Sequence, residues 1–218
     1  MVDQPEDMFD FIWNVLESRF LSEESPIKSW VDLQNPKLCV ITGSNASGKS
    51  LIRKILTSHL KRAGIELIHL SIEKRCGHGI EKALIYGNED EDSTGFNSAN
   101  LIIKAFNTGN GRTNPFFLLF DEPEIGCGEE LQLLIGERIA DQYDKMPNCL
   151  GIFVMTHSRV ITKELLKHNP SHWNMSEEAG LEKWTNRKLQ KPNYTLEDLI
   201  DTGHERWRQI ESLIKRKP

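Results

Sequence analysis

The chain has little cysteine and no long apolar run. Its 218 residues include four cysteines, and no two of them have the C-x-x-C spacing of a zinc or redox site. No apolar stretch reaches the roughly 20 residues that a transmembrane helix needs. Asp3, Glu6 and Asp7 leave the N-terminus without the basic and apolar character of a signal peptide. We therefore expect a cytoplasmic protein with free thiols and no membrane partner.

The sequence also lacks a net positive charge and the common catalytic signatures. The formal net charge is -5, so no global excess of basic residues points to a nucleic-acid-binding domain. Neither the H-E-x-x-H motif of metalloproteases nor the G-x-S-x-G motif of serine hydrolases occurs. The sequence also lacks internal repeats and low-complexity tracts. The composition is otherwise ordinary for a globular protein, and the length suits one domain.

Against these absences, residues 43–50 read G-S-N-A-S-G-K-S, a complete P-loop motif. An apolar run at 38–41 predicts a buried strand before it, and helical spacing predicts a helix after it. Main-chain N–H groups of such a loop bind phosphate, Lys49 reaches the terminal phosphates, and the Ser50 hydroxyl holds Mg²⁺. The expected nucleotide-binding residues here are Gly43, Ser44, Asn45, Ala46, Ser47, Gly48, Lys49, Ser50 and Leu51.

Two later apolar runs end in polar residues that fit the same chemistry. The run at 116–120 is followed by Asp121, a candidate Mg²⁺ ligand opposite Ser50, and by Glu122. A carboxylate at Glu122 is placed to polarise a water molecule for attack on the terminal phosphate. The run at 150–155 leads to His157, a candidate contact to that phosphate and water. We therefore predict Glu122 and His157 as catalytic residues, and Asp121 and Ser50 as metal-binding residues.

Strand-like and helical segments alternate along the chain. Continuous apolar strands between helices predict an α/β fold, a P-loop NTPase with a mostly parallel sheet covered by helices on both faces. Residues 1–35 are expected to form an N-terminal helix, with a stripe of Phe9, Ile12, Trp13, Leu16 and Phe20, and a short strand. Residues 36–170 are the expected ATP-binding core, with another short strand at 84–86, and 171–218 a helical extension of the same domain.

The order of four motifs resembles the ABC-type ATPases. These motifs are the P-loop, S-T-G-F-N-S at 93–98, F-F-L-L-F-D-E-P-E at 116–124 and V-M-T-H-S at 154–158. The sequence looks most similar to the soluble branch of these AAA-type ATP-binding heads that contains SMC proteins, the RecF recombination ATPase and overcoming-lysogenisation-defect nucleases. This resemblance implies a head-to-tail homodimer that encloses two ATP molecules. Ser93 and Gly95 of one subunit would then complete the ATP site of the other.

The sequence departs from that family in three places. No glutamine lies between Ser50 and Asp121, where the family has its Q-loop residue, and Glu73 and Arg75 are the nearest polar candidates. The usual aspartate after the acidic strand end is missing, and residues 125–128 read I-G-C-G. The segment between the P-loop and residue 93 is too short for a coiled-coil arm. The expected protein is a minimal head.

These observations favour an ATPase that uses ATP and Mg²⁺ to gate a separate effector or nuclease, in a bacterial or phage DNA-processing or anti-phage defence system. Two alternatives stay open: a P-loop kinase acting on a small molecule, and an ATP-gated scaffold that hydrolyses little. DNA is a further candidate partner through the basic C-terminal residues Arg206, Arg208, Lys215, Arg216 and Lys217.

Overall fold

The computed structural model describes residues 5–18, 20–21, 25, 27–71, 94–176, 179–188, 191 and 193–215. The strands are β1 (Trp30–Asp32), β2 (Leu38–Thr42), β3 (Glu66–Ser71), β4 (Phe116–Asp121), β5 (Cys149–Met155) and β6 (Ser171–Asn174). The helices are α1 (Met8–Leu16), α2 (Lys49–Ala63), α4 (Thr94–Asn110), α5 (Glu129–Gln142), α6 (Arg159–Leu166), α7 (Leu181–Asn186) and α8 (Leu196–Lys215). In this part of the chain, no helix is both long and apolar enough to cross a bilayer.

One six-stranded sheet organises the described residues, in the order β1-β6-β2-β5-β4-β3. All neighbouring pairs are parallel except β1 and β6. Strand β5 lies between β2, which leads into the P-loop, and β4, which ends at the acidic residues. Because these strands are parallel, their carboxyl ends meet at one edge of the sheet, where ligands bind in open α/β folds.

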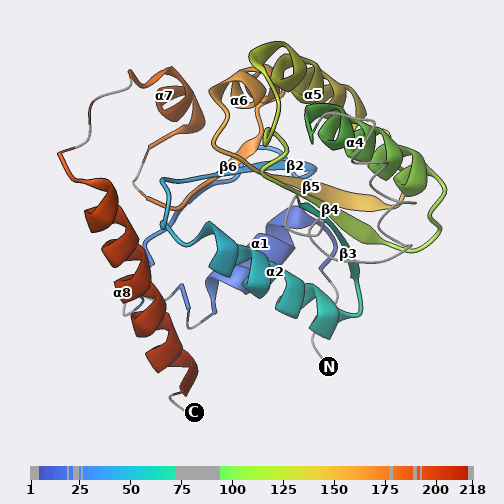
Figure 1. Cartoon of the computed structure of the whole chain (residues 1–218). Coiled ribbons are helices and arrows are strands. Elements are labelled where there is room, and N and C mark those ends of the chain that lie inside the picture. The colour runs from blue at the N-terminus through green and yellow to red at the C-terminus, as the bar shows by residue number, and fades with distance from the viewer. Residues whose placement is uncertain are drawn as a thin grey trace.

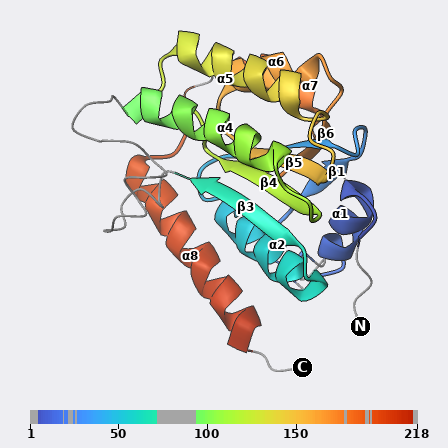
Figure 2. The same ribbon diagram turned by 90° about the vertical axis from the view of Figure 1, so that its right-hand side faces the viewer.

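Helices cover both faces of the sheet (Figure 1). On one face α1 and α2 enclose a core that contains the aromatic residues Phe11, Phe117, Phe153 and Trp173. On the other face α4, α5 and α6 enclose a core around Phe106, Phe116 and Phe120. The views in Figures 1 and 2 show α8 separate from both layers, beside α2. The predicted fold class, a mostly parallel α/β sheet covered on both faces, is confirmed.

Local expectations hold for most elements. The helical spacing of apolar residues over 97–106, 131–139 and 160–166 agrees with α4, α5 and α6, each of which is longer than the stretch that shows the spacing. Gly64 ends α2 in a left-handed conformation at φ +71° and donates its N–H to carbonyls of the last turn. Cys39 and Cys149 are buried free thiols on β2 and β5, and burial raises the pKa of Cys149 to about 11.

The N-terminal helix is present, but the expected apolar stripe was wrong in one respect. Its buried side chains are Met8, Phe11, Ile12 and Val15, whereas Trp13 is 61 % exposed. Phe11 packs against the ring of Phe117, with the ring centroids 5.1 Å apart. Contacts with aromatic residues of the core therefore determine which face of α1 is buried. The helical spacing of the sequence alone does not contain these contacts.

The expectation of a purely helical segment after residue 170 needs correction. Residues 171–174 form β6, a completely buried strand between β1 and β2. The sequence Ser-His-Trp-Asn hides it, because its polar side chains find partners inside. Ser171 Oγ accepts from the N–H groups of Gln34 and Asn35, each at 3.0 Å, and His172 Nε2 lies 2.7 Å from Thr42 Oγ1. The short strand expected at 84–86 lies outside the described residues.

Candidate functional site

The P-loop connects β2 to α2 and turns at two glycines. A side chain at Gly48 would need a left-handed backbone at φ +107°, and its Cβ would lie 2.7 Å from Ile27 Cδ1. A Cβ at Gly43 would lie 2.4 Å from Ser47 Oγ. Gly48 is also the N-cap of α2. The first N–H groups of that helix lack helical partners and are available to an anion in the loop.

Lys49 begins α2 and folds its side chain back over the P-loop. Its Nζ donates to the carbonyl oxygens of Gly43 at 3.2 Å and Ser44 at 3.4 Å, and lies 2.7 Å from His157 Nε2. Burial lowers the pKa of the Lys49 ammonium, whereas the nearby carboxylates, Glu122 foremost, act in the opposite direction. The P-loop thus carries a partly desolvated positive charge at its mouth.

Glu122 follows the end of β4 in a strained turn. Its backbone is left-handed, with φ +52°, which costs a residue other than glycine about 1–2 kcal/mol. Its N–H donates to the carbonyl of Met155 on β5 at 2.8 Å. Its Oε1 lies 3.4 Å from His157 Nε2, and this hydrogen bond is the largest cause that lowers the pKa of the Glu122 carboxyl. The charge of Lys49 acts in the same direction. Strain of this kind is often kept where function needs a particular side-chain position.

Glu124 holds the segment that carries His157. Its Oε1 accepts the His157 N–H and its Oε2 accepts the Thr156 hydroxyl, both at 2.7 Å. The Thr156 hydroxyl oxygen also accepts the N–H of Ser158 at 2.9 Å. The loop after β4 and the loop after β5 are therefore joined by a carboxylate, which fixes the backbone of His157.

The His157 side chain stands between a cation and an anion. Its Nε2 carries either a lone pair or a hydrogen, so it serves one neighbour at a time. With the lone pair there it accepts from Lys49, and with the hydrogen there it donates to Glu122. The imidazole is thus placed to pass between two hydrogen-bonded states as the charges around it change.

Asp121 is oriented by two basic side chains. Its Oδ2 lies 3.5 Å from Arg53 Nε and 3.2 Å from His69 Nε2. Over the described ranges, no three His, Cys, Asp or Glu side chains form a metal site of their own. The oxygen donors of Ser50 and Asp121 nevertheless suit Mg²⁺, because this ion commonly takes one or two protein ligands and completes its shell with water and phosphate.

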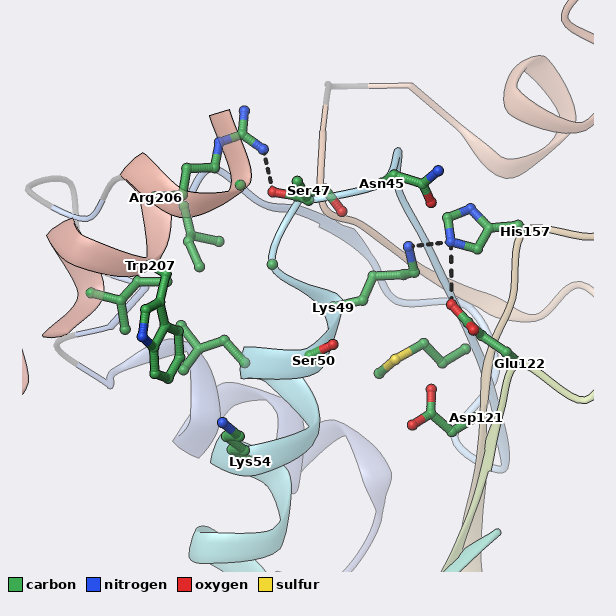
Figure 3. Close-up of a pocket in the computed structure, with 17 residues that line it drawn as sticks. Asn45, Ser47, Lys49, Ser50, Lys54, Asp121, Glu122, His157, Arg206 and Trp207 are labelled. Carbon is green, nitrogen blue, oxygen red and sulfur yellow. Dashed lines mark hydrogen bonds and ion pairs between the residues drawn. The ribbon is translucent and has the colours of Figure 1, made fainter. Parts of the chain in front are cut away.

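A cavity of about 260 Å³ joins these groups. Residues 45–51, Asp121, Glu122 and His157 all line it, and Figure 3 shows Lys49, His157 and Glu122 directed toward one another. Residues from outside the predicted motifs complete it: Ile27, Lys54, Gly203, Arg206, Trp207 and Ile210. An anion-binding loop, two carboxylates, a lysine and a histidine thus share one solvent-filled space.

The remaining predicted residues lie elsewhere. Gly43 and Ser44 do not line the cavity, but their carbonyl oxygens accept from Lys49 Nζ. Gly95 lies in the first turn of α4, buried, and a Cβ there would be 2.6 Å from the Gly126 carbonyl. Close packing within the chain therefore accounts for this glycine, and Gly95 does not line the cavity. Ser93, Glu73 and Arg75 lie outside the described residues.

Sequence reasoning missed three groups of residues at this site. Arg53 and His69 flank Asp121. A histidine inside the apolar stretch 65–70 is a polar residue in a predicted strand, and this was a visible signal of a role for His69. Glu124 stood in the D-E-P-E string without an assigned role. Lys54, Arg206 and Trp207 had no signal, because more than 150 residues separate Lys54 from Trp207 in sequence.

Comparison with known proteins adds little. No protein-family model matches the sequence, and no curated protein matches it. One solved structure that matches is the Orc1 protein of Aeropyrum pernix in complex with DNA, at 16 % identity and a TM-score of 0.32. The match covers 79 % of this chain and 44 % of the Orc1 chain. The site is therefore assigned from its own P-loop, strand ends and cavity, which are those of a P-loop nucleotide-binding fold.

Proposed function

We propose that this chain is an ATPase that binds ATP with Mg²⁺ and hydrolyses its terminal phosphate. The observation that carries the proposal is the meeting of Lys49, Glu122 and His157 at the mouth of a P-loop, in one cavity. A phosphate-binding loop alone would support binding only. A strained carboxylate and a histidine beside it add the groups that an attacking water needs.

The described contacts suggest how the residues act. Lys49 now bonds to His157, and terminal phosphate oxygens would replace that imidazole as the partner of the ammonium. His157 Nε2 would then be free to serve Glu122 or the phosphate. Glu122, whose lowered pKa keeps it ionised, would orient the attacking water and accept its proton.

Ser50 and Asp121 would hold Mg²⁺ between the P-loop and the end of β4. The ion, when bound, supplies positive charge that offsets the charge of the phosphates. Arg53 and His69 hold the Asp121 carboxylate in place and leave its second oxygen for a water ligand.

Release of inorganic phosphate from ATP tests the proposal. We expect turnover in the parent chain and a loss of about 100- to 10,000-fold in Glu122→Gln, the usual contribution of a positioned general base. ATP binding measured by calorimetry should remain. Glu129→Gln, an exposed glutamate in the first turn of α5, is the matched control and should keep parent turnover. Phosphate release by Glu122→Gln at the parent rate would remove Glu122 from the reaction.

The kinase alternative predicts a different result in the same assay. A small-molecule kinase needs an acceptor and releases little free phosphate from ATP alone. A base at Glu122 serves a water molecule or an acceptor hydroxyl, so phosphate release without an added acceptor is the result that separates the two. An ATP-gated scaffold would bind ATP tightly and release phosphate very slowly.

We further propose an ABC-type cycle, on the basis of the motif order. Two chains would pair head to tail, ATP would close the dimer, and hydrolysis would open it to gate an effector protein, with DNA a further candidate ligand. A DNA-processing or anti-phage setting follows from the resemblance alone. Gly95 is already used for packing within the chain, so Ser93 is the residue on which the dimer proposal depends.

Mixing two inactive variants tests the shared site. Ser93→Arg would spoil the contact that a chain offers to its partner, and Lys49→Ala would spoil the P-loop of its own chain. In a mixed dimer, the intact P-loop of the first chain faces the intact contact of the second, so one site is whole. We expect phosphate release to recover on mixing. No recovery, although mixed dimers form, would place both residues in one chain's site and contradict the dimer proposal.

A further inference from the structure

The cavity has two chemically different ends (Figure 3). The charged end consists of Lys49, Ser50, Asp121, Glu122 and His157. The aromatic end consists of Ile27, Leu51, Lys54, Trp207 and Ile210. Residues 45–48 of the P-loop and the first turn of α2 line the cavity with both groups.

Helix α8 supplies Trp207 and Ile210 to the aromatic end and touches the P-loop directly. Arg206 donates from a guanidinium nitrogen to the Ala46 carbonyl at 2.6 Å. Gly203 lies against the same residue, since a Cβ there would be 3.4 Å from Ala46 Cβ. Ile210, one turn further, is buried in the core with α2. The helix is therefore anchored by Ile210 and held at the loop by Arg206.

Trp207 is much more exposed than Ile210, the residue that anchors α8. It is 48 % exposed, whereas Ile210 is 5 % exposed. The ammonium of Lys54, an exposed residue on α2, lies 4.7 Å from the centre of the Trp207 ring. A large aromatic ring thus stands at the cavity wall, and the only group described over its face is the end of an exposed lysine side chain, which a planar ligand can displace.

A nucleoside triphosphate has the same division of chemistry as this cavity. Its phosphates need main-chain donors and cations, and its base needs an apolar or aromatic surface. The aromatic face of a tryptophan stacks on any base and gains most from a purine, because stacking grows with the shared ring area. Lys54 and Arg206 add donors that suit the ring nitrogens of a purine.

We propose that Trp207 on α8 is the base-stacking residue of the nucleotide site, and that the aromatic end takes a purine. This inference rests on the proposed function, because it assumes phosphates on the P-loop. The base stacks on the Trp207 ring, where it displaces the Lys54 ammonium, and it contacts Ile27. Helix α8 is thereby part of the nucleotide site and is fixed more firmly to the P-loop when a nucleotide is bound.

Binding of ADP and of inorganic pyrophosphate, measured by calorimetry on the full chain with Mg²⁺, separates the two ends. The two ligands share their phosphates, and only ADP has a base. In Trp207→Ala we expect ADP to bind about 10- to 100-fold more weakly, as for loss of one base–aromatic stack, with pyrophosphate unchanged within about twofold. Trp207→Phe keeps an aromatic face and should hold ADP within about fivefold of the parent.

Trp13→Ala is the matched control, because it removes another exposed tryptophan that does not line the cavity. It should change neither ligand. If Trp207→Ala weakens both ligands equally, or weakens neither, the base-stacking role is overturned. If the parent chain binds neither ligand, the proposed function itself fails. Should the alanine variant not fold, an ADP affinity of Trp207→Phe more than 100-fold below the parent, with pyrophosphate equally reduced, would likewise overturn the inference.

Discussion

The charged end and the aromatic end of the cavity are built in opposite ways. Lys49 begins α2 just after the loop that follows β2, and Glu122 and His157 follow β4 and β5. Strand β5 pairs with both β2 and β4 along their length. Trp207 and Arg206 stand on a helix that lies outside both layers and is anchored by few contacts. The end proposed for chemistry is held by paired strands, and the end proposed for base recognition by a peripheral helix.

This difference indicates which kinds of substitution each end of the cavity tolerates. Proton and phosphate chemistry depends on placing atoms within a fraction of an ångström, so paired strands and the Glu124 bridge are suited to it. Stacking is less demanding in direction and accepts a surface that moves. We therefore expect substitutions at the charged end to affect both ligands or turnover, and substitutions on α8 to affect only ligands with a base.

The largest expected effect is at Lys49. Lys49→Ala should weaken ADP and pyrophosphate alike, on the order of 1,000-fold, because two charge-assisted hydrogen bonds of about 2 kcal/mol each are lost. Calorimetry of both ligands measures it. Lys61→Ala, an exposed lysine in the last turn of α2, is the control and should bind both as the parent does. A loss confined to ADP would contradict the division between the two ends.

The stability of the folded protein at acidic pH tests the role of His172, which bonds to Thr42 at the end of the strand before the P-loop. Burial lowers the pKa of His172 to about 4, so the neutral imidazole that bonds Thr42 is favoured in the folded state. The unfolded chain takes up that proton near its ordinary pKa of 6.5. Stability from this group is therefore complete above about pH 6.5 and falls as the pH drops toward 4, by about 3 kcal/mol. Urea unfolding across this range should show a shallower decline in His172→Gln. His204→Gln, which changes an exposed histidine, is the control and should decline as the parent does. If stability declined as steeply in His172→Gln as in the parent, the role of His172 would be contradicted.

Glu124 separates positioning from binding at the charged end. Glu124→Ala removes two acceptors, so His157 loses its backbone anchor, and we expect turnover to fall about 10-fold and stability by about 2 kcal/mol. ATP affinity should stay within about twofold. Glu124→Gln should recover most turnover, because its amide oxygen accepts from His157 and its amide nitrogen donates to Thr156. Equal damage in both variants would mean that the negative charge, rather than the anchor, is what matters.

The smallest expected effect is at Arg206. Its bond to the Ala46 carbonyl is exposed, and such a bond is worth about 0.5–1 kcal/mol. Arg206→Ala should therefore weaken ADP two- to fivefold, by about that amount, and leave pyrophosphate unchanged. Arg208→Ala, two residues along the same helix, is the control. If pyrophosphate weakened as much as ADP, α8 would be supporting the P-loop itself, and the two ends would not be separable.

Much of the charged end could be predicted from the sequence because local signals carry it. The P-loop pattern, the acidic pair after an apolar strand and the histidine after the next one each depend on residues that are neighbours in the chain. Parallel strands then bring their ends to one edge as a rule of the fold class. The contacts of Arg53, His69 and Glu124 needed the structure, because they depend on side-chain direction between strands.

Long-range packing explains the remaining failures. Strand β6 was hidden because Ser171 and His172 look exposed until their partners on other segments are known. The buried face of α1 was chosen by Phe117 and Phe153, far along the chain. Gly95 suited a contact to a partner, yet its neighbour Gly126 shows that close packing inside the chain requires a glycine there.

By itself, the sequence determined that this protein has a phosphate-binding loop, a parallel α/β sheet and carboxylates at its edge. These features follow from short motifs and from periodicity, which act over a few residues. Only the tertiary structure decided what closes the other end of the cavity. Trp207 and Lys54 meet because α8 packs beside α2 through Ile210, and burial of apolar surface between distant segments has no fixed spacing in the sequence.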